Sequence, residues 1–157
     1  MTMIAALLLP GCNHREIPSS PQKALEQFYA ATDVAEDQLM DPLILRGPDV
    51  VPLLIREVPS RKMPRRLYGI LAIGHIGDGR GLDVLKQIVS DPSEKEDIRY
   101  GALRSITLID RDLALEVAKG YSDQEIPGLS RLQHELESGR PLERRTFEQA
   151  LRGEHWP

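Results

Sequence analysis

Four glycines and a histidine lie together at the centre of the chain: Gly74, His75, Gly77, Gly79 and Gly81. Glycine-rich loops can cradle phosphate groups, but the spacing here matches neither Gly-x-Gly-x-x-Gly after a strand nor Gly-x-x-x-x-Gly-Lys-[Ser/Thr]. We therefore interpret the segment as a turn. The other three histidines are isolated in the sequence, so we predict a structural role for His75 and no metal site.

Nucleophilic catalysis finds no support in the residue pattern. The chain has no Gly-x-Ser-x-Gly motif, which in hydrolases presents a serine on a sharp turn. The chain's one cysteine, Cys12, lies beside an apolar run near the N-terminus and has another interpretation, given below. The sequence predicts a protein that is not an enzyme and that needs no cofactor.

Two clusters of charge could recognise a ligand. Asp33, Glu36, Asp37 and Asp41 are spaced to form one acidic face of a helix, which would be solvated or would bind a cation or a basic partner.

The second cluster is basic and consists of Arg61, Lys62, Arg65 and Arg66. These four are our candidate partner-binding residues. They could contact a protein, anionic lipid headgroups or peptidoglycan carboxylates. The alternative is an exposed loop in which Arg66 pairs with a neighbouring repeat.

Length and composition indicate one domain with an aliphatic core. The chain has 157 residues, of which 41% are hydrophobic but only 4% aromatic, so Leu, Ile, Val and Ala must fill the interior. The formal net charge is −4. A general nucleic-acid binder normally carries a basic face, so we expect no nucleic-acid partner.

The N-terminus has the pattern of a targeting signal. The apolar run over residues 3–9 is too short to span a bilayer, which takes about 20 helical residues. Leu9-Pro10-Gly11-Cys12 resembles the lipobox of bacterial lipoproteins. The resemblance implies a cleaved signal peptide over 1–11, lipidation of Cys12, a polar tether over 12–20 and anchoring in the cell envelope. Asn13 follows the cysteine where some Gram-negative families use Asp for inner-membrane retention, so the periplasmic face of the outer membrane is favoured in a Gram-negative cell.

Apolar residues recur at helical spacing along most of the remaining chain. Ser20-Pro21 predicts the start of a helix that runs to about residue 31. Thr32-Asp33 predicts the start of a second helix, which Pro42 bends or restarts. Ser93-x-x-Glu96 and Thr146-x-x-Gln149 have the pattern of capping boxes. Further helices are expected over 49–58, 66–73, 82–89, 98–109, 113–121 and 126–136.

An internal repeat relates two of these stretches. The residues that follow Arg66 align on those that follow Arg99 at a shift of 33 residues, with Ile73 on Ile106 and Ile76 on Ile109. A repeat of about 30–45 residues that contains two amphipathic helices is typical of an α-solenoid.

The central copy, Arg66-x-x-Gly69-x-x-x-Ile73-Gly74-x-Ile76-Gly77-Asp78, resembles the HEAT-like repeat named from phycobilisome lyases. The resemblance covers roughly 33–122 and implies an all-α fold, a short right-handed α-solenoid of HEAT-like helix pairs, within a domain over 21–157. In this pattern Gly74 and Gly77 are expected to leave the helix with φ > 0, and Asp78 to cap the next one. The segments 20–32 and 123–157 are expected to cap the ends.

Such repeats present surfaces to other proteins, so the resemblance implies a membrane-anchored protein-interaction scaffold with an unidentified protein partner. Two alternatives stay open. One is a bilin-lyase-like enzyme or enzyme subunit, and the other is an envelope protein that binds peptidoglycan or lipid. The fold alone does not choose between them.

Overall fold

The structure, a computed structural model, describes residues 15–155, and in these residues the regular secondary structure is helical, with no strand. The prediction of an all-α fold is confirmed. The predictions for the signal peptide and for Cys12 lie outside the described residues. The α-helices are α1 (Pro21–Ala30), α2 (Asp41–Arg46), α3 (Val51–Glu57), α4 (Arg66–Ile76), α5 (Leu82–Ser90), α6 (Glu96–Ile109), α7 (Arg111–Ala118), α8 (Leu129–Glu137) and α9 (Phe147–Arg152), and the 3-10 helices are η1 (Glu36–Gln38), η2 (Gly47–Val50) and η3 (Gly79–Gly81).

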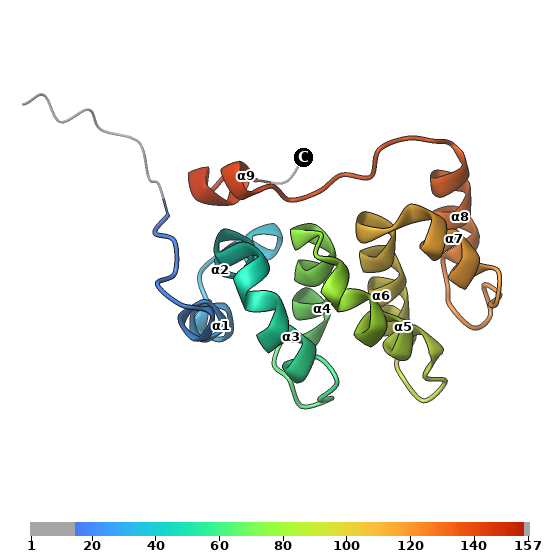
Figure 1. Ribbon diagram of the computed structural model, residues 1–157, viewed down its shortest axis with the longest axis horizontal. Helices are drawn as coiled ribbons and strands as arrows, with labels where there is room; N and C mark the ends of the chain where they lie inside the picture. The colour runs from blue at the N-terminus through green and yellow to red at the C-terminus, as the bar shows by residue number, and fades with distance from the viewer. Residues whose placement is uncertain (1–14, 156–157) are drawn as a thin grey trace, which may run out of the picture.

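The helices from α2 and α3 to α7 and α8 follow one another along the long axis, with α4, α5 and α6 between them (Figure 1). α4 packs along α6, and both α5 and α7 pack against α6. α1 lies against α2 at one end of the row, and α8 lies beside α7 at the other (Figure 1). Within this row each helix therefore packs mainly against helices one or two positions away in the chain.

The core between these helices is aliphatic, as the composition predicts. Ile70 and Ile73 of α4, Leu85 of α5, and Leu103 and Ile106 of α6 are fully buried. Each such side chain contributes about 1.5–3 kcal/mol by leaving water. The apolar stripes of α4, α5 and α6 thus form one continuous interior.

A glycine inside α4 brings α4 and α6 into close contact. A Cβ atom on Gly74 would lie 2.6 Å from the Cα atom of Ser105, so no larger residue fits without moving the backbone. The Ser105 hydroxyl donates to the Ile70 carbonyl oxygen at 3.0 Å and ties the two helices together. The prediction that Gly74 leaves the helix is wrong, because α4 continues to Ile76 and the positive φ, 78°, occurs at Gly77.

Three of the predicted helix starts are confirmed. The Ser20 side chain accepts a hydrogen bond from the Lys23 backbone N–H at the start of α1. Thr146 forms the expected capping box at the start of α9. Asp78 accepts from the Arg80 N–H and begins η3, which leads directly into α5.

Two other predicted starts are wrong. Ser93 does not cap α6, because the helix begins at Glu96 with Lys95 as its N-cap residue, and the Ser93 hydroxyl accepts from Arg61 and donates to the Asp91 carboxylate instead. The helix expected from Thr32-Asp33 is also absent from the described chain. The segment 31–40 contains only η1, and α2 begins at Asp41.

Arg66 and Arg99, which align at the 33-residue shift, make matching contacts. Arg66 Nε donates to the Val58 carbonyl oxygen at 2.5 Å, and Arg99 Nε donates to the Val89 carbonyl oxygen at 2.8 Å. Both acceptors lie at the C-terminal end of the preceding helix. A terminal guanidinium nitrogen of each arginine then reaches the loop that leads to the next helix pair. Each arginine thus joins its own helix to the helix before it and to the loop after it.

After α8 the chain runs back along the row as an extended segment over residues 140–146, which we call the strap (Figure 1). Arg111 donates to the Arg140 carbonyl oxygen at 3.0 Å, and Arg144 donates to the Leu108 carbonyl oxygen. The strap leads to α9, which packs on α2 at the far end of the row from α8. The segment 123–157, expected to cap one end, therefore covers both.

Candidate functional site

A fully buried ion pair fastens the strap to the N-terminal helices. Arg145 donates to Asp41 from Nε at 2.8 Å and from Nη2 at 2.7 Å, and neither side chain is exposed. Arg15 donates to the same carboxylate at 2.7 Å and to the Gln38 side chain at 2.6 Å. Gln38 in turn donates to the Gly153 carbonyl oxygen at 2.8 Å. Two-point pairing of this kind is among the stronger hydrogen-bonded contacts in proteins.

The acidic residues do not form the predicted helix face. Asp41 is the first residue of α2 and is buried, whereas Asp33, Glu36 and Asp37 precede that helix. Burial raises the pKa of the Asp41 carboxyl, and the neighbouring guanidinium groups act in the opposite direction. Glu36 accepts a hydrogen bond from the Tyr68 hydroxyl. The acidic cluster is therefore divided between the core and contacts with other elements.

A pocket of about 300 Å³ lies against the strap, and we call it the strap pocket. Residues of α2 and η2 form one wall, the end of α4 forms another, and the strap with the start of α9 forms the third. His75, at the end of α4, is 3% exposed, and its Nδ1 atom accepts a hydrogen bond from the Arg145 backbone N–H at 2.9 Å. The lining residues are Ile44, Gly47, Pro48, His75, Ile76, Arg144, Arg145, Thr146 and Phe147.

His75 is held in its neutral form at physiological pH. Burial lowers the pKa of the imidazole to about 3, and the positive charges of Arg104, Arg144 and Arg145 act in the same direction. A neutral imidazole keeps a lone pair for the Arg145 N–H, which a protonated ring would not have. The folded state therefore depends on an uncharged His75.

We expect acid to destabilise the fold through His75. The pKa of this residue is about 3 when folded and has an ordinary value of 6.5, so between these values the unfolded chain binds a proton that the folded chain excludes, and stability falls as the pH falls. Each pH unit removes about 1.4 kcal/mol, or about 3 kcal/mol between pH 6.5 and pH 4. Urea unfolding at several pH values measures this loss. His75→Asn keeps an acceptor but does not titrate, so the same pH profile in both chains would contradict the prediction.

The four predicted partner-binding residues occupy the turn between α3 and α4, and two of them point inward. Arg66 is buried and is bound to Val58 and Glu94, as the alternative of a paired arginine expects. Arg65 donates to the Phe28 carbonyl oxygen at 2.7 Å and to that of Ala31, which joins the end of α1 to the start of α4.

Arg65 also has φ 52°, the one positive φ of a residue other than glycine within 15–155. A side chain in this region costs about 1–3 kcal/mol. The two carbonyl contacts of its guanidinium group offset that cost. Arg65 therefore has a structural role, independent of any role in partner binding.

The other two basic residues are exposed. Arg61 donates to Asp91 at 3.0 Å and to Ser93 at 2.7 Å, while 54% of its side chain stays exposed. Lys62 is exposed at the tip of the turn. Arg61, Arg65 and Arg66, but not Lys62, line a hollow of about 390 Å³ together with Leu67, Tyr68, Ser93, Glu94, Lys95, Asp97 and Ile98. That these residues bind a partner stays a prediction.

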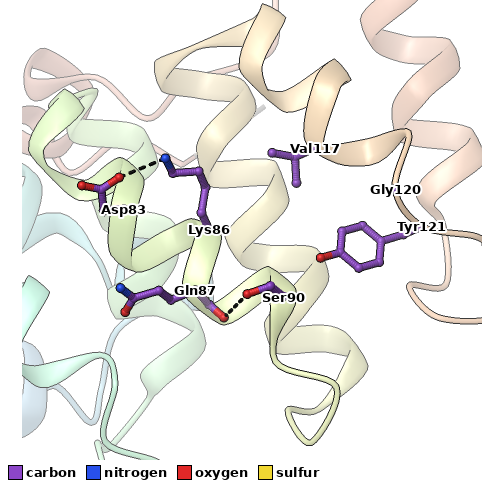
Figure 2. A pocket seen from close by; sticks show the side chains of 7 residues that line it. All are labelled: Asp83, Lys86, Gln87, Ser90, Val117, Gly120 and Tyr121. Carbon is purple, nitrogen blue, oxygen red and sulfur yellow. Dashed lines mark hydrogen bonds and ion pairs between the residues drawn. The ribbon is translucent and has the colours of Figure 1, made fainter.

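A second surface groove, of about 600 Å³, lies between α5 and the end of α7 (Figure 2). Asp83 and Lys86 on its α5 side form an ion pair at 3.0 Å. Tyr121 lines the groove from the other side (Figure 2). Its ring centre lies 5.1 Å from the Arg99 guanidinium carbon, within cation–π range. The charges of this groove are paired with each other.

Sequence reasoning missed the buried cluster. Asp41 and Arg145 are 104 residues apart, and no short motif links two residues at that separation. Arg15, expected within the polar tether, is bound to the domain instead. The one usable signal was Asp41-Pro42, a helix-start pattern that places an acidic residue in a first turn.

Within residues 15–155 no group of three or more His, Cys, Asp or Glu side chains could hold a metal ion, and no helix has both the length and the apolar character to cross a membrane. Comparisons with protein families, curated proteins and solved structures give no match to this chain. The function is therefore argued from the contacts described above.

Proposed function

We propose that the chain is a protein-binding module held at a membrane by a lipid on Cys12, and that its helix pairs form a short right-handed α-solenoid of the HEAT-like type. The observation that carries the proposal is the matching contacts of Arg66 and Arg99. Equivalent bonds at the same point of two successive helix pairs are what a repeated unit needs for regular stacking. Stacked helix pairs provide an extended surface for a partner.

The surface that we propose for the partner is the hollow at the basic turn. Leu67 and Tyr68 are half-buried and supply apolar contact area. Arg61, Lys62 and Lys95 are exposed around it. A partner segment that carries carboxylates next to an apolar side chain would complement this surface in charge and in polarity.

The position of Arg15 restricts the proposed anchor. Arg15 is fixed to Asp41 and Gln38, and its backbone N–H donates to the Leu151 carbonyl oxygen at 2.9 Å. Three chain steps separate it from Cys12, and three residues span at most about 10 Å. A lipid on Cys12 would thus hold the domain directly against the membrane surface, without the long tether expected over 12–20.

Crosslinking and co-isolation from native membranes tests both parts of the proposal. We expect the full-length chain to fractionate with membranes and to recover a partner, and the Cys12→Ala chain to lose both. If the two chains fractionate alike, the lipid anchor is wrong.

A charge-reversal pair tests the surface. Lys62→Glu with Lys95→Glu is expected to reduce partner recovery by about tenfold or more, because like charges then face the partner's carboxylates. Lys119→Glu with Arg131→Glu is the matched control: both residues are exposed and lie outside the hollow, and the change in net charge is the same. Equal losses in the two double variants would show that total charge, and not this surface, governs recovery.

A further inference from the structure

The strap pocket differs from the other two hollows in the sign of its lining charges. Its walls contain Arg144 and Arg145 and no Asp or Glu. The hollow at the basic turn, in contrast, contains two acidic residues beside its basic ones, and the α5–α7 groove contains an internal ion pair. Although Asp41 neutralises Arg145 from behind the pocket, the positive charges of Arg104, Arg144 and Arg145 still lower the pKa of His75. The strap pocket is thus the hollow among these three that favours an anion.

Arg144 has N–H donors left for a ligand, and its guanidinium group is held by a backbone carbonyl group. It is exposed, it forms no ion pair with a described carboxylate, and its hydrogen bond to the Leu108 carbonyl oxygen uses one hydrogen of Nη2. An arginine has five N–H donors, so others remain for a ligand. The guanidinium group lies against Gly77, where a Cβ atom would come within 2.5 Å of Nη1. A side chain at position 77 would displace the end of the Arg144 side chain, and φ 78° at this position independently favours glycine.

A second polar group lies at the same rim. The Thr146 hydroxyl accepts a hydrogen bond from the Gln149 N–H at 3.2 Å. Its own hydrogen is left to donate, since a hydroxyl can do both. An oxyanion between Thr146 and Arg144 would receive donors from both.

The remaining lining is apolar. Ile44, Pro48 and Ile76 line the pocket from α2, η2 and α4. Phe147, the first residue of α9, is 39% exposed and is one of the few large apolar side chains that the described surface leaves in water. Aromatic residues, Phe among them, and arginine are both enriched at protein interfaces.

We propose that the strap pocket binds a carboxylate attached to a small apolar group. The carboxylate accepts hydrogen bonds from Arg144 and Thr146, and the apolar group lies against Phe147 and Pro48. The volume of about 300 Å³ is at the lower end of the usual range for ligand pockets. This chemistry is that of a short-chain or aromatic acid and also that of the C-terminal residue of a protein. The proposal is independent of the one for the basic turn.

Titration of the full-length chain with benzoate, followed by NMR of the Arg145 backbone amide, tests the pocket. We expect saturable shifts with benzoate and none with benzamide. Arg144→Gln should weaken binding about tenfold, the effect of one charge-assisted hydrogen bond. Arg140→Gln is the matched control, because Arg140 is an exposed arginine of the same strap outside the lining. Equal effects of the two variants, or saturation by benzamide, would overturn the proposal.

Two further comparisons keep the test decisive and identify the source of the carboxylate. Phe147→Ala leaves the arginines in place and should weaken the binding of benzoate more than the binding of acetate. Equal weakening of the two would overturn the role of the apolar wall.

The dipeptide acetyl-Gly-Val is compared with its C-terminal amide. Tighter binding of the free-acid dipeptide than of benzoate assigns the site to a protein C-terminus, and the reverse order assigns it to a small acid. Absence of binding by every carboxylate would overturn the proposal.

Discussion

Arg145→Met is expected to lower the free energy of unfolding by about 3–5 kcal/mol, the usual cost of removing one partner of a buried ion pair. The substitution leaves the fully buried Asp41 carboxylate with Arg15 as its remaining ion-pair partner. It also removes the hydrogen bond from Arg145 to the Glu154 carbonyl oxygen. The first contact joins the strap to α2 and the second joins the strap to the end of α9, so we expect the strap and α9 to detach more readily.

Urea denaturation measures the loss, and limited proteolysis within 140–146 reports whether the strap opens before the rest unfolds. Arg140→Met, an exposed arginine of the same strap, should change stability by no more than about 0.5 kcal/mol. Asp41→Leu combined with Arg145→Met should recover much of the loss, since an apolar pair of similar volume is often no less stable than a buried ion pair. If Arg145→Met costs no more than Arg140→Met, the buried pair does not hold the strap.

The central helices could be predicted from the sequence because the residues that define each helix lie within that helix. The helices expected from residues 66 and 82 and the helix expected over 98–109 correspond to α4, α5 and α6, since each carries its own apolar stripe. Capping patterns predicted the starts of helices less reliably. Thr146 and Ser93 show the same spacing, yet only Thr146 caps a helix, because α6 begins at Glu96, too far along the chain for Ser93 to be its N-cap residue.

The N-terminal part was predicted less well. A helix was expected from Thr32-Asp33 with a bend or restart at Pro42, but the structure contains only the later part, α2, which begins at Asp41. Asp41, expected on an acidic helix face, turns into the core. An aspartate is rarely buried unless it is paired. The pairing that permits this burial comes from Arg145, near the other end of the chain. A pattern search along the sequence has no means of detecting it.

The four basic residues of the candidate site were likewise predicted only in part. A run of basic residues indicates an exposed face, and Arg61 and Lys62 are indeed exposed. Arg65 and Arg66 look identical to them in sequence, but they bind backbone carbonyl groups and Glu94. Which arginine of a cluster is used internally depends on carbonyl groups that only the packed helix ends bring within reach.

The second large effect on the free energy of unfolding is expected from substitution of Arg66 and Arg99. Arg66→Met should cost about 3–5 kcal/mol, because the Glu94 carboxylate is 5% exposed and loses its close partner. Arg61 stays 3.8 Å from that carboxylate and compensates only in part. Arg99→Met should cost less, about 1–3 kcal/mol, since it removes two hydrogen bonds to carbonyl groups and the contact with the Tyr121 ring but leaves no carboxylate without its close partner.

A second substitution separates the buried charge from the loss of the repeat contact. Glu94→Gln removes the charge, so we expect it to restore about half of the stability lost in Arg66→Met and none of that lost in Arg99→Met, as measured by urea unfolding of the single and double variants. The part not restored in the Arg66 series should then approach the cost of Arg99→Met, because both arginines bind the end of the preceding helix in the same way. A full restoration by Glu94→Gln would mean that Arg66 serves only to neutralise Glu94, and the matching contacts would no longer support a repeated stacking unit.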